Sequence, residues 1–166
     1  MSDVFSKPKR SDVMSHIRGR GNKETELALA KLLHIAGIHG WRRYVRIRLD
    51  DVHKPSMSVI PDFVFRSSRV AVFVDGCFWH GCPEHSNPVK WIAKSSMPLY
   101  RGSGRIRSGK TFWRQKLEAN KQRDRAVNSL LRRHDWRVVR IWEHDLTKDG
   151  HRCVAKIKNT LSKQTK

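Results

Sequence analysis

The sequence predicts a mixed α/β domain in which helices pack on a small sheet. Two observations support this: stretches with helical periodicity alternate with short apolar runs, and these segments follow the order helix, three strands, helix, strand, helix. The chain has 166 residues, which is enough for one domain with its own core. We expect a single domain over residues 22–166, preceded by a flexible basic arm over residues 1–21.

The first helix is expected from about Lys23 to Ala36, with Asn22 as its N-cap and Gly37 at its left-handed terminus. Four residues share one face of this helix: Glu26, Leu29, Ala30 and Leu33. Glu26 therefore directs a carboxylate along the apolar stripe, toward the body of the protein. A carboxylate that faces the core needs a partner.

Three strands are expected after this helix. In the first, Val45, Ile47 and Leu49 alternate with arginines, which predicts one apolar and one basic face. Residues 50–58 are polar and contain a proline, so we expect a loop there. The apolar run at residues 63–65 predicts the second strand. Residues 70–74 are apolar throughout, which is typical of a strand in the centre of its sheet.

The second half of the chain opens with residues 86–110, which are rich in serine, glycine, proline and basic residues and show no period. This pattern predicts an inserted mobile loop. A basic helix is expected over about residues 111–133, a strand over residues 137–142 and a terminal helix after it. The expected inward residues of the basic helix are Trp113, Leu117, Asn120, Val127, Leu130 and Leu131.

The chain is strongly basic. It has 35 lysine and arginine residues against 15 aspartate and glutamate residues, and the net charge of +20 is spread along the whole chain. Such a charge indicates a polyanionic partner, most simply nucleic acid. The sequence has no long apolar run, no signal peptide and an odd count of three cysteines, so we expect a cytoplasmic protein.

One short segment concentrates metal-ligating side chains. Residues 75–85 read Asp-Gly-Cys-Phe-Trp-His-Gly-Cys-Pro-Glu-His and directly follow the third strand. Thiolate and imidazole are ligands that zinc prefers, and the spacing of Cys77, His80, Cys82 and His85 lets one loop supply several of them. Cys153, in the terminal helical pattern, is expected to be a spare thiol.

Two acids, Asp62 and Asp75, are expected at the ends of neighbouring strands. Hydrolysis of a phosphodiester bond needs a divalent cation held by carboxylate oxygens, and Asp62 can hold it. His80 can accept the proton of the attacking water, because imidazole titrates near neutral pH. Glu26 can orient His80 or a metal-bound water. Each acid could instead cap a strand or lie at the surface, so this pattern alone leaves the site open.

The metal loop (residues 73–85) and the sequence Trp-Glu-His at residues 142–144 form a highly specific combination. Further segments belong to the same pattern: residues 10–14, 25–26, 61–63, 112–124 and 135–141. Together they resemble the very-short-patch-repair mismatch endonucleases, which have the restriction-endonuclease-like fold. The resemblance covers roughly residues 10–146. It implies a magnesium-dependent enzyme that nicks one DNA strand beside a thymine opposite guanine.

The resemblance also implies roles for single residues. Asp62 is similar to the family's magnesium ligand, aided by the backbone carbonyl of Val74. His80 is similar to the general base, and Glu26 to its support. The resemblance assigns a structural zinc site, with no open coordination position, to four residues: Cys77, Cys82, His85 and His144. His80 as the zinc ligand in place of His85 remains an alternative. In that case His80 could not act as the general base.

For a monomer on DNA, the resemblance implies two kinds of contact. Met14, Phe78 and Trp79 resemble the apolar wedge that enters the base stack beside the mismatch, where a wobble pair costs less to open. The expected phosphate contacts are basic residues: Arg18, Arg20, Arg42, Arg43 and Lys110.

Two alternatives remain open from the sequence. The long insertion at residues 86–110 would favour a restriction or defence nuclease of the same fold that cuts fully paired DNA. A zinc-stabilised DNA-binding module without activity would follow if Glu26, Asp62 and His80 did not converge. Asp75 stands where some relatives carry a histidine that assists the reaction, so it is either a second acidic metal ligand or a sign that this assistance is absent.

Overall fold

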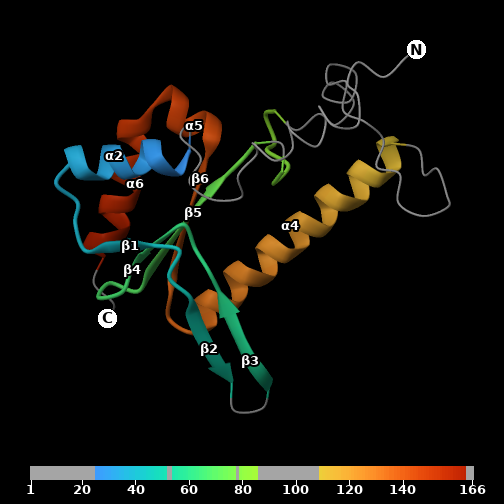
Figure 1. The fold of residues 1–166 in the computed structure, drawn as a ribbon, viewed down its shortest axis with the longest axis horizontal. Helices are drawn as coiled ribbons and strands as arrows, with labels where there is room; N and C mark the ends of the chain where they lie inside the picture. Colours follow the sequence, from blue (N-terminus) through green and yellow to red (C-terminus); the bar gives the residue numbers. More distant parts are fainter. Residues whose placement is uncertain (1–24, 52–53, 78, 86–108, 164–166) are drawn as a thin grey trace, which may run out of the picture.

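The structure, a computed structural model, describes residues 25–51, 54–77, 79–85 and 109–163. Its helices and strands follow one another in this order: α2 (Glu26–Ile35), β1 (Trp41–Arg43), β2 (Ile47–Asp51), β3 (Lys54–Val59), β4 (Phe63–Phe65), β5 (Val70–Asp75), α4 (Gly109–Arg133), β6 (Arg137–Trp142), α5 (Glu143–Lys148) and α6 (Gly150–Ser162). The predicted mixed α/β class is confirmed, with helices flanking a small sheet (Figure 1). The predicted arm and most of the predicted insertion lie outside the described residues.

The main sheet has four strands in the order β1-β4-β5-β6. β5 pairs antiparallel with β4 and parallel with β6, so the sheet is mixed. A parallel pair needs a long crossover connection, and α4 belongs to that connection. The central position predicted for residues 70–74 is confirmed, because β5 has a partner on each side.

Helices cover both faces of this sheet. On one face, Leu29 of α2 and Ile157 of α6 share a core cluster with Val72 of β5. On the other face, Leu131 of α4 packs in a second cluster with Ala71. Neighbouring residues of a strand point to opposite faces, so β5 joins the two cores. Figure 1 shows the same division, with α2 and α6 on one side of the sheet and α4 on the other.

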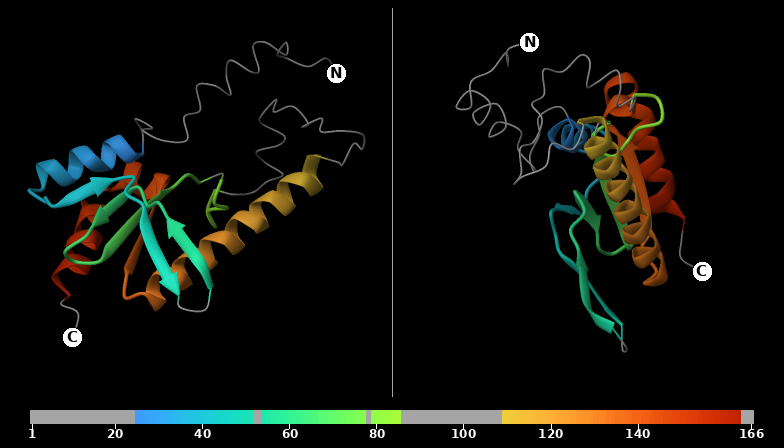
Figure 2. Two further views of the ribbon diagram at one scale, coloured as in Figure 1. Left: turned by 60° about the horizontal axis from the view of Figure 1, so that its bottom comes forward. Right: turned by 90° about the vertical axis from the view of Figure 1, so that its right-hand side faces the viewer.

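Residues 50–58 are not the loop that the sequence predicted. β2 continues to Asp51, and β3 pairs with it antiparallel, with Ile47 opposite Val59. The polar composition concealed this strand, since Met57 and Ser58 are exposed and Val59 is buried. A proline is tolerated in such a segment because a two-stranded sheet consists of edges. Figure 2 shows the hairpin projecting from the body of the molecule.

Two further elements were not predicted. β1 is only three residues long and contains two arginines, so it has no apolar alternation. It is ordered by pairing with β4. α5 begins at Glu143, directly after β6, and is separate from the one terminal helix that the sequence predicted. Both elements owe their existence to tertiary neighbours more than to their own pattern.

The observed helix boundaries differ from the predicted ones by a few residues. α2 begins at Glu26 with Thr25 as its N-cap, later than the predicted start, while Gly37 follows its end with φ +66° as expected. α4 begins at Gly109, so the predicted loop over residues 86–110 extends two residues too far. The inward faces are as predicted where the side chains are described: Leu117, Leu130 and Leu131 of α4 are buried.

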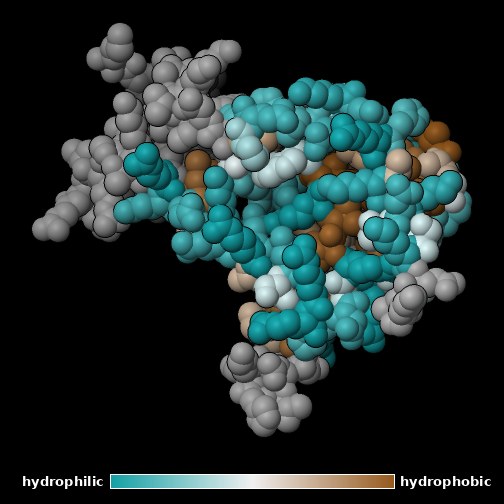
Figure 3. Space-filling view, turned by 180° about the vertical axis from the view of Figure 1, so that it is seen from behind, coloured by the Kyte–Doolittle hydropathy of each residue, from teal (hydrophilic) through white to brown (hydrophobic). Residues whose placement is uncertain are grey.

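No helix in the described part of the chain has the length and apolar character needed to cross a membrane. Figure 3 shows that hydrophilic residues cover most of the face seen from behind, with hydrophobic residues visible between them.

Candidate active site and Cys/His cluster

Asp62 lies at the edge where β4 begins and β5 ends. The antiparallel register, with Phe63 opposite Val72, brings it beside the last residues of β5. There the backbone N–H of Val74 donates a hydrogen bond of 2.8 Å to Asp62 Oδ2. Burial raises the pKa of Asp62 to about 6; the Val74 hydrogen bond opposes this shift, and the carboxylates of Glu26 and Asp75 add to it. Grouped carboxylates at a strand end are suited to a bound cation.

Glu26 is the buried acid that the first helix was expected to direct inward, and it is 8% exposed. It accepts hydrogen bonds from the hydroxyl of Tyr44 and, at 3.3 Å, from Arg43 Nη2. The backbone N–H of Tyr44 in turn donates to the carbonyl of Asp62, at 3.2 Å. The predicted partner of the core-facing carboxylate is therefore an arginine and a tyrosine, and this cluster is connected to Asp62 through the backbone.

His80 is held by acids from two elements. Its Nδ1 lies 2.7 Å from Asp124 Oδ2 of α4 and 3.6 Å from Asp75 Oδ1 of β5. Arg140 joins the same acids, with Nε 3.0 Å from Asp75 and Nη2 3.0 Å from Asp124. The first of these distances is an ion-pair contact without hydrogen-bond alignment, because Nε has no hydrogen-bond partner. With Nδ1 on carboxylates, Nε2 is the ring nitrogen that can face a substrate.

The two carboxyl groups around His80 titrate differently. Burial raises the pKa of Asp75, against the opposing effect of Arg140 and His80. Burial also raises the pKa of Asp124, but hydrogen bonds from His80 and Arg140 outweigh it, so the net shift is downward. Asp124 is thus the acid that stays ionised most readily beside the imidazole.

Asp124 and Arg140 were not among the predicted site residues. Glu26 was predicted to orient His80 or a metal-bound water, but the carboxylate that contacts His80 Nδ1 is that of Asp124. Asp124 is the only aspartate of α4, a mainly basic helix, but nothing near it in the sequence indicates His80, which is 44 residues away. Asp75, the residue left open, is paired with Arg140 and lies near His80.

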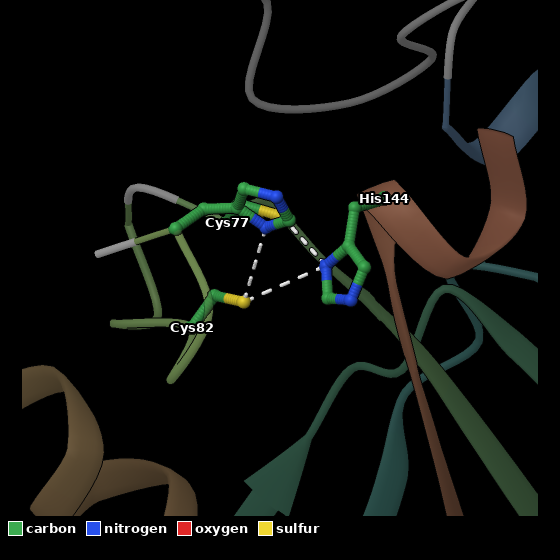
Figure 4. Close-up of side chains that lie close together, drawn as sticks. Cys77, Cys82 and His144 are labelled. Carbon is green, nitrogen blue, oxygen red and sulfur yellow. Dashed lines mark hydrogen bonds between the residues drawn. The ribbon is translucent and has the colours of Figure 1, made fainter. Parts of the chain in front are cut away.

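Four predicted ligands form a compact Cys/His cluster: Cys77, Cys82, His85 and His144. Their ligand atoms all lie within 4.8 Å of one another. His144 Nδ1 is 3.2 Å from Cys77 Sγ and 3.5 Å from Cys82 Sγ, and His85 Nδ1 is 3.6 Å from Cys82 Sγ. Figure 4 shows both thiols of the loop and the imidazole of α5 directed toward one another.

These separations suit a tetrahedral metal. Bond lengths of about 2.3 Å to sulfur and 2.0 Å to nitrogen place ligand atoms roughly 3.3–3.8 Å apart at tetrahedral angles. Burial raises the pKa of the Cys77 thiol to about 11, with the backbone N–H of His144 opposing and the Cys82 thiol adding to the shift. A bound cation would reverse this preference, because metal ligation deprotonates a thiol. The structure places His85, and not His80, in this set.

The loop between the two cysteines rests on α4. Asn120 Nδ2 donates 2.8 Å to the carbonyl of Trp79, and Lys116 Nζ lies 5.6 Å from the centre of the Trp79 ring. Glu143 Oε2 accepts a hydrogen bond of 3.2 Å from the N–H of Cys77. The cluster and α4 thus fix the segment that carries His80.

The predicted DNA contacts are only partly described. Arg42 is exposed on β1, whereas the guanidinium of Arg43 is directed to Glu26 and is half-buried. Trp79 is half-buried in the loop. Four others lie outside the described residues: Met14, Arg18, Arg20 and Phe78. Lys110 lies in the first turn of α4, and its side chain is also outside the described part.

Comparison with known proteins gives one family. The protein-family model named DNA mismatch endonuclease Vsr matches residues 2–85. The type II nicking enzyme V.NaeI of Lentzea aerocolonigenes is 36% identical over 152 residues, which is 92% of this chain and 76% of that protein. The type II nicking enzyme V.XorIIP of Xanthomonas oryzae pv. oryzae is 32% identical over 161 residues, 97% and 98% of the two chains. The DNA mismatch endonuclease Vsr of Escherichia coli is 33% identical over 143 residues, 86% and 74%.

Proposed function

Because this chain belongs to the family of the DNA mismatch endonuclease Vsr, we propose that it is a DNA endonuclease that nicks one strand next to a T:G mismatch by magnesium-dependent hydrolysis. The observation that carries the proposal is the convergence of Asp62, Val74 and His80 at one end of the sheet. The backbone N–H of Val74 donates to Asp62, and Asp75, the next residue of β5, lies 3.6 Å from His80 Nδ1. The restriction-endonuclease-like fold and the single domain over residues 22–166 are part of this proposal.

In this mechanism Asp62 and the carbonyl of Val74 would hold a magnesium ion, and the ion would supply charge stabilisation to the phosphate. His80 takes the proton of the attacking water at Nε2, and the water oxygen forms a bond to phosphorus as the bond to the leaving sugar oxygen breaks. Asp124 fixes the ring through Nδ1 and stabilises the imidazolium that forms. Glu26 supports the site through Tyr44, whose backbone contacts Asp62.

The Cys/His cluster is proposed as a structural zinc site. Its two sulfur and two nitrogen ligands would fill all four positions around a tetrahedral ion. No substrate or water could then bind to the metal. Its role is to tie the loop that carries His80 to the start of α5. This anchoring sets the position of the imidazole relative to Asp62.

The DNA-binding roles are proposed on charge and on the family. The net charge of +20 supports backbone binding, with Arg42 and the basic face of α4 as the described contributors. Trp79, carried on the same loop as His80, is the described member of the proposed wedge, together with Met14 and Phe78. The substrate is double-stranded DNA, and the enzyme is expected to act in the cytoplasm as a monomer.

The proposal is tested by a nicking assay with Mg²⁺ on end-labelled duplexes that differ only in a T:G or C:G pair. We expect nicking of the thymine strand in the T:G duplex alone, and none with Asp62→Asn at an unchanged DNA affinity. Equal nicking of both duplexes would instead support an endonuclease for fully paired DNA. Absence of any nicking by the native chain would leave only the DNA-binding module.

A further inference from the structure

An arginine-lined hollow lies away from the candidate active site. It has a volume of about 510 Å³. Two segments of the chain form its walls. One is β2 with the residue before it, and the other is the turn between β4 and β5. Trp136, just ahead of β6, completes the lining. Its residues are Arg46, Ile47, Arg48, Arg66, Arg69 and Trp136. We call this set the arginine hollow.

The charge of the arginine hollow is poorly compensated. None of its lining residues is acidic. Arg46 Nη1 donates to the hydroxyl of Ser58, a neutral partner, at 2.9 Å. Arg69 Nη1 is 3.5 Å from Asp135 Oδ2 in an exposed pair, which offsets little charge in water. Arg48 and Arg66 have no ion-pair partner among the residues that the structure describes. Four guanidinium groups around one hollow repel one another unless an anion lies between them.

The arginine hollow is at the opposite end of β5 from the candidate active site. Arg69 directly precedes Val70, the first residue of β5, while Asp75 beside His80 is the last. A strand rises about 3.3 Å per residue, so the two ends of β5 are roughly 17 Å apart. A second hollow, of about 410 Å³, is lined by Arg125, Arg132 and Arg133 with two polar residues of α4. Neither hollow includes Asp62 or His80, and both are basic.

We propose that the arginine hollow is an accessory site for the DNA backbone, which holds phosphate groups at least about five base pairs from the cut, given a rise of about 3.4 Å per base pair. This inference rests on the proposed function, because its ligand is the flank of the DNA that the enzyme nicks. The planar guanidinium fork matches phosphate oxygens in a bidentate manner. Ile47 and Trp136 supply an apolar floor for the arginine stems, which leaves the charged ends to the ligand.

The test uses a double variant, Arg48→Gln with Arg66→Gln, which removes two charges at positions without a described ion pair. The matched control, Arg152→Gln with Lys158→Gln, removes two charges from exposed positions on α6. Binding is measured with T:G duplexes whose flanks on each side of the mismatch increase from about four to about twenty base pairs. We expect the double variant to lose about tenfold in affinity for the long duplexes and less than about twofold for the shortest. Its slope of log affinity against log salt should also fall by about two on long duplexes.

The nicking rate of the double variant on the shortest duplex, at saturating enzyme, should equal that of the native chain. An equal loss of affinity in the control, or a loss that does not depend on flank length, would overturn the accessory site. So would an unchanged affinity for the long duplexes. A length-dependent loss in a protein that shows no nicking at all would instead overturn the proposed activity and leave the site in place.

Discussion

At the scale of single residues, the candidate active site depends on how one imidazole is held. His80 has Nδ1 on Asp124 and near Asp75, and Arg140 contacts both acids. The arrangement fixes the ring orientation and favours one tautomer, with Nε2 directed away from the acids. Asp124 is therefore a positioning residue of the proposed mechanism, although it touches no reacting atom.

Replacing Asp124 by asparagine should slow nicking by about 10- to 100-fold while DNA affinity changes little. The amide cannot stabilise the imidazolium that forms as His80 takes its proton. Single-turnover nicking with excess enzyme, together with equilibrium binding to the same duplex, separates the two effects. Glu118→Gln, at an exposed acid of the same helix, is the matched control. A loss of affinity that accounts for the whole loss of rate would argue against a positioning role.

The charge of Asp124 should also make the free energy of unfolding depend on pH. Its pKa is lowered in the folded state, so Asp124 contributes stability above its unfolded pKa of about 4 and loses that contribution as the pH falls through the lower folded value. The free energy of unfolding of the native chain should therefore exceed that of Asp124→Asn at neutral pH. The two should converge below about pH 4. Denaturant titrations over this pH range measure the difference; a constant difference would mean that packing, and not charge, is responsible.

At the scale of elements, the loop that carries the two cysteines and His80 is held by three contacts, two to α5 and one to α4. The cluster ties it to α5 through His144, Asn120 of α4 holds the carbonyl of Trp79, and Glu143 accepts from the N–H of Cys77. Gly81 makes its turn possible, with φ +64° and Lys121 packed against it. Loss of any one of these contacts should therefore change the position of His80.

Gly81→Ala and Gly37→Ala should cost similar amounts of stability. Both glycines have a left-handed φ, at +64° and +66°, so each alanine costs about 1–2 kcal/mol for the backbone conformation. At Gly37 the new Cβ has nothing within 4 Å. At Gly81 it would lie 2.3 Å from Cε of Lys121, the far end of a flexible side chain that can move aside. Thermal unfolding of the two variants compares the losses. A larger loss for Gly81→Ala would mean that Lys121 is held in place and supports the loop.

Metal analysis should find about one zinc ion per chain, and Cys82→Ala should remove it. Cys153→Ala is the matched control, because Cys153 is also buried but lies outside the cluster. Removal of zinc with a selective chelator should abolish nicking, and zinc together with Mg²⁺, but not Mg²⁺ alone, should restore it. Full activity of the zinc-free chain would contradict the anchoring role of the cluster.

At the scale of the whole molecule, charge and layering act together. Helices cover both faces of the sheet, which leaves the ends of its strands for function: the candidate active site at one end of β5 and the arginine hollow at the other. The basic residues are spread along the whole sequence and not confined to one tail. A polyanion can therefore be held along an extended path.

This distribution predicts a steep salt dependence of DNA binding. With about six to ten phosphates neutralised, the affinity should fall roughly 10³- to 10⁵-fold between about 50 and 200 mM monovalent salt. Fluorescence anisotropy on a mismatch duplex measures it. A slope of log affinity against log salt shallower than about two would mean that few phosphates are contacted.

Residue types and their spacing predicted the features that depend on near neighbours along the chain. Alternation and periodicity predicted β4, β5, β6, α4 and α6. The spacing of Cys77, His80, Cys82 and His85 predicted a metal loop, and the structure groups Cys77, Cys82 and His85 of these four. Glu26 was placed inward by its position on the apolar stripe of α2. The family resemblance supplied His144, which no local pattern connects to the loop.

The packing of the elements against one another determines the features that depend on residues far apart in the chain. β1 and β3 are strands because they pair with β4 and β2, and their own side chains give no strand signal. Asp124 and Arg140 meet His80 and Asp75 because α4 packs beside a parallel pair of strands. The arginine hollow likewise combines β2, a turn and Trp136. Such contacts form when separate faces are buried against one another, and a linear pattern contains no record of which faces meet.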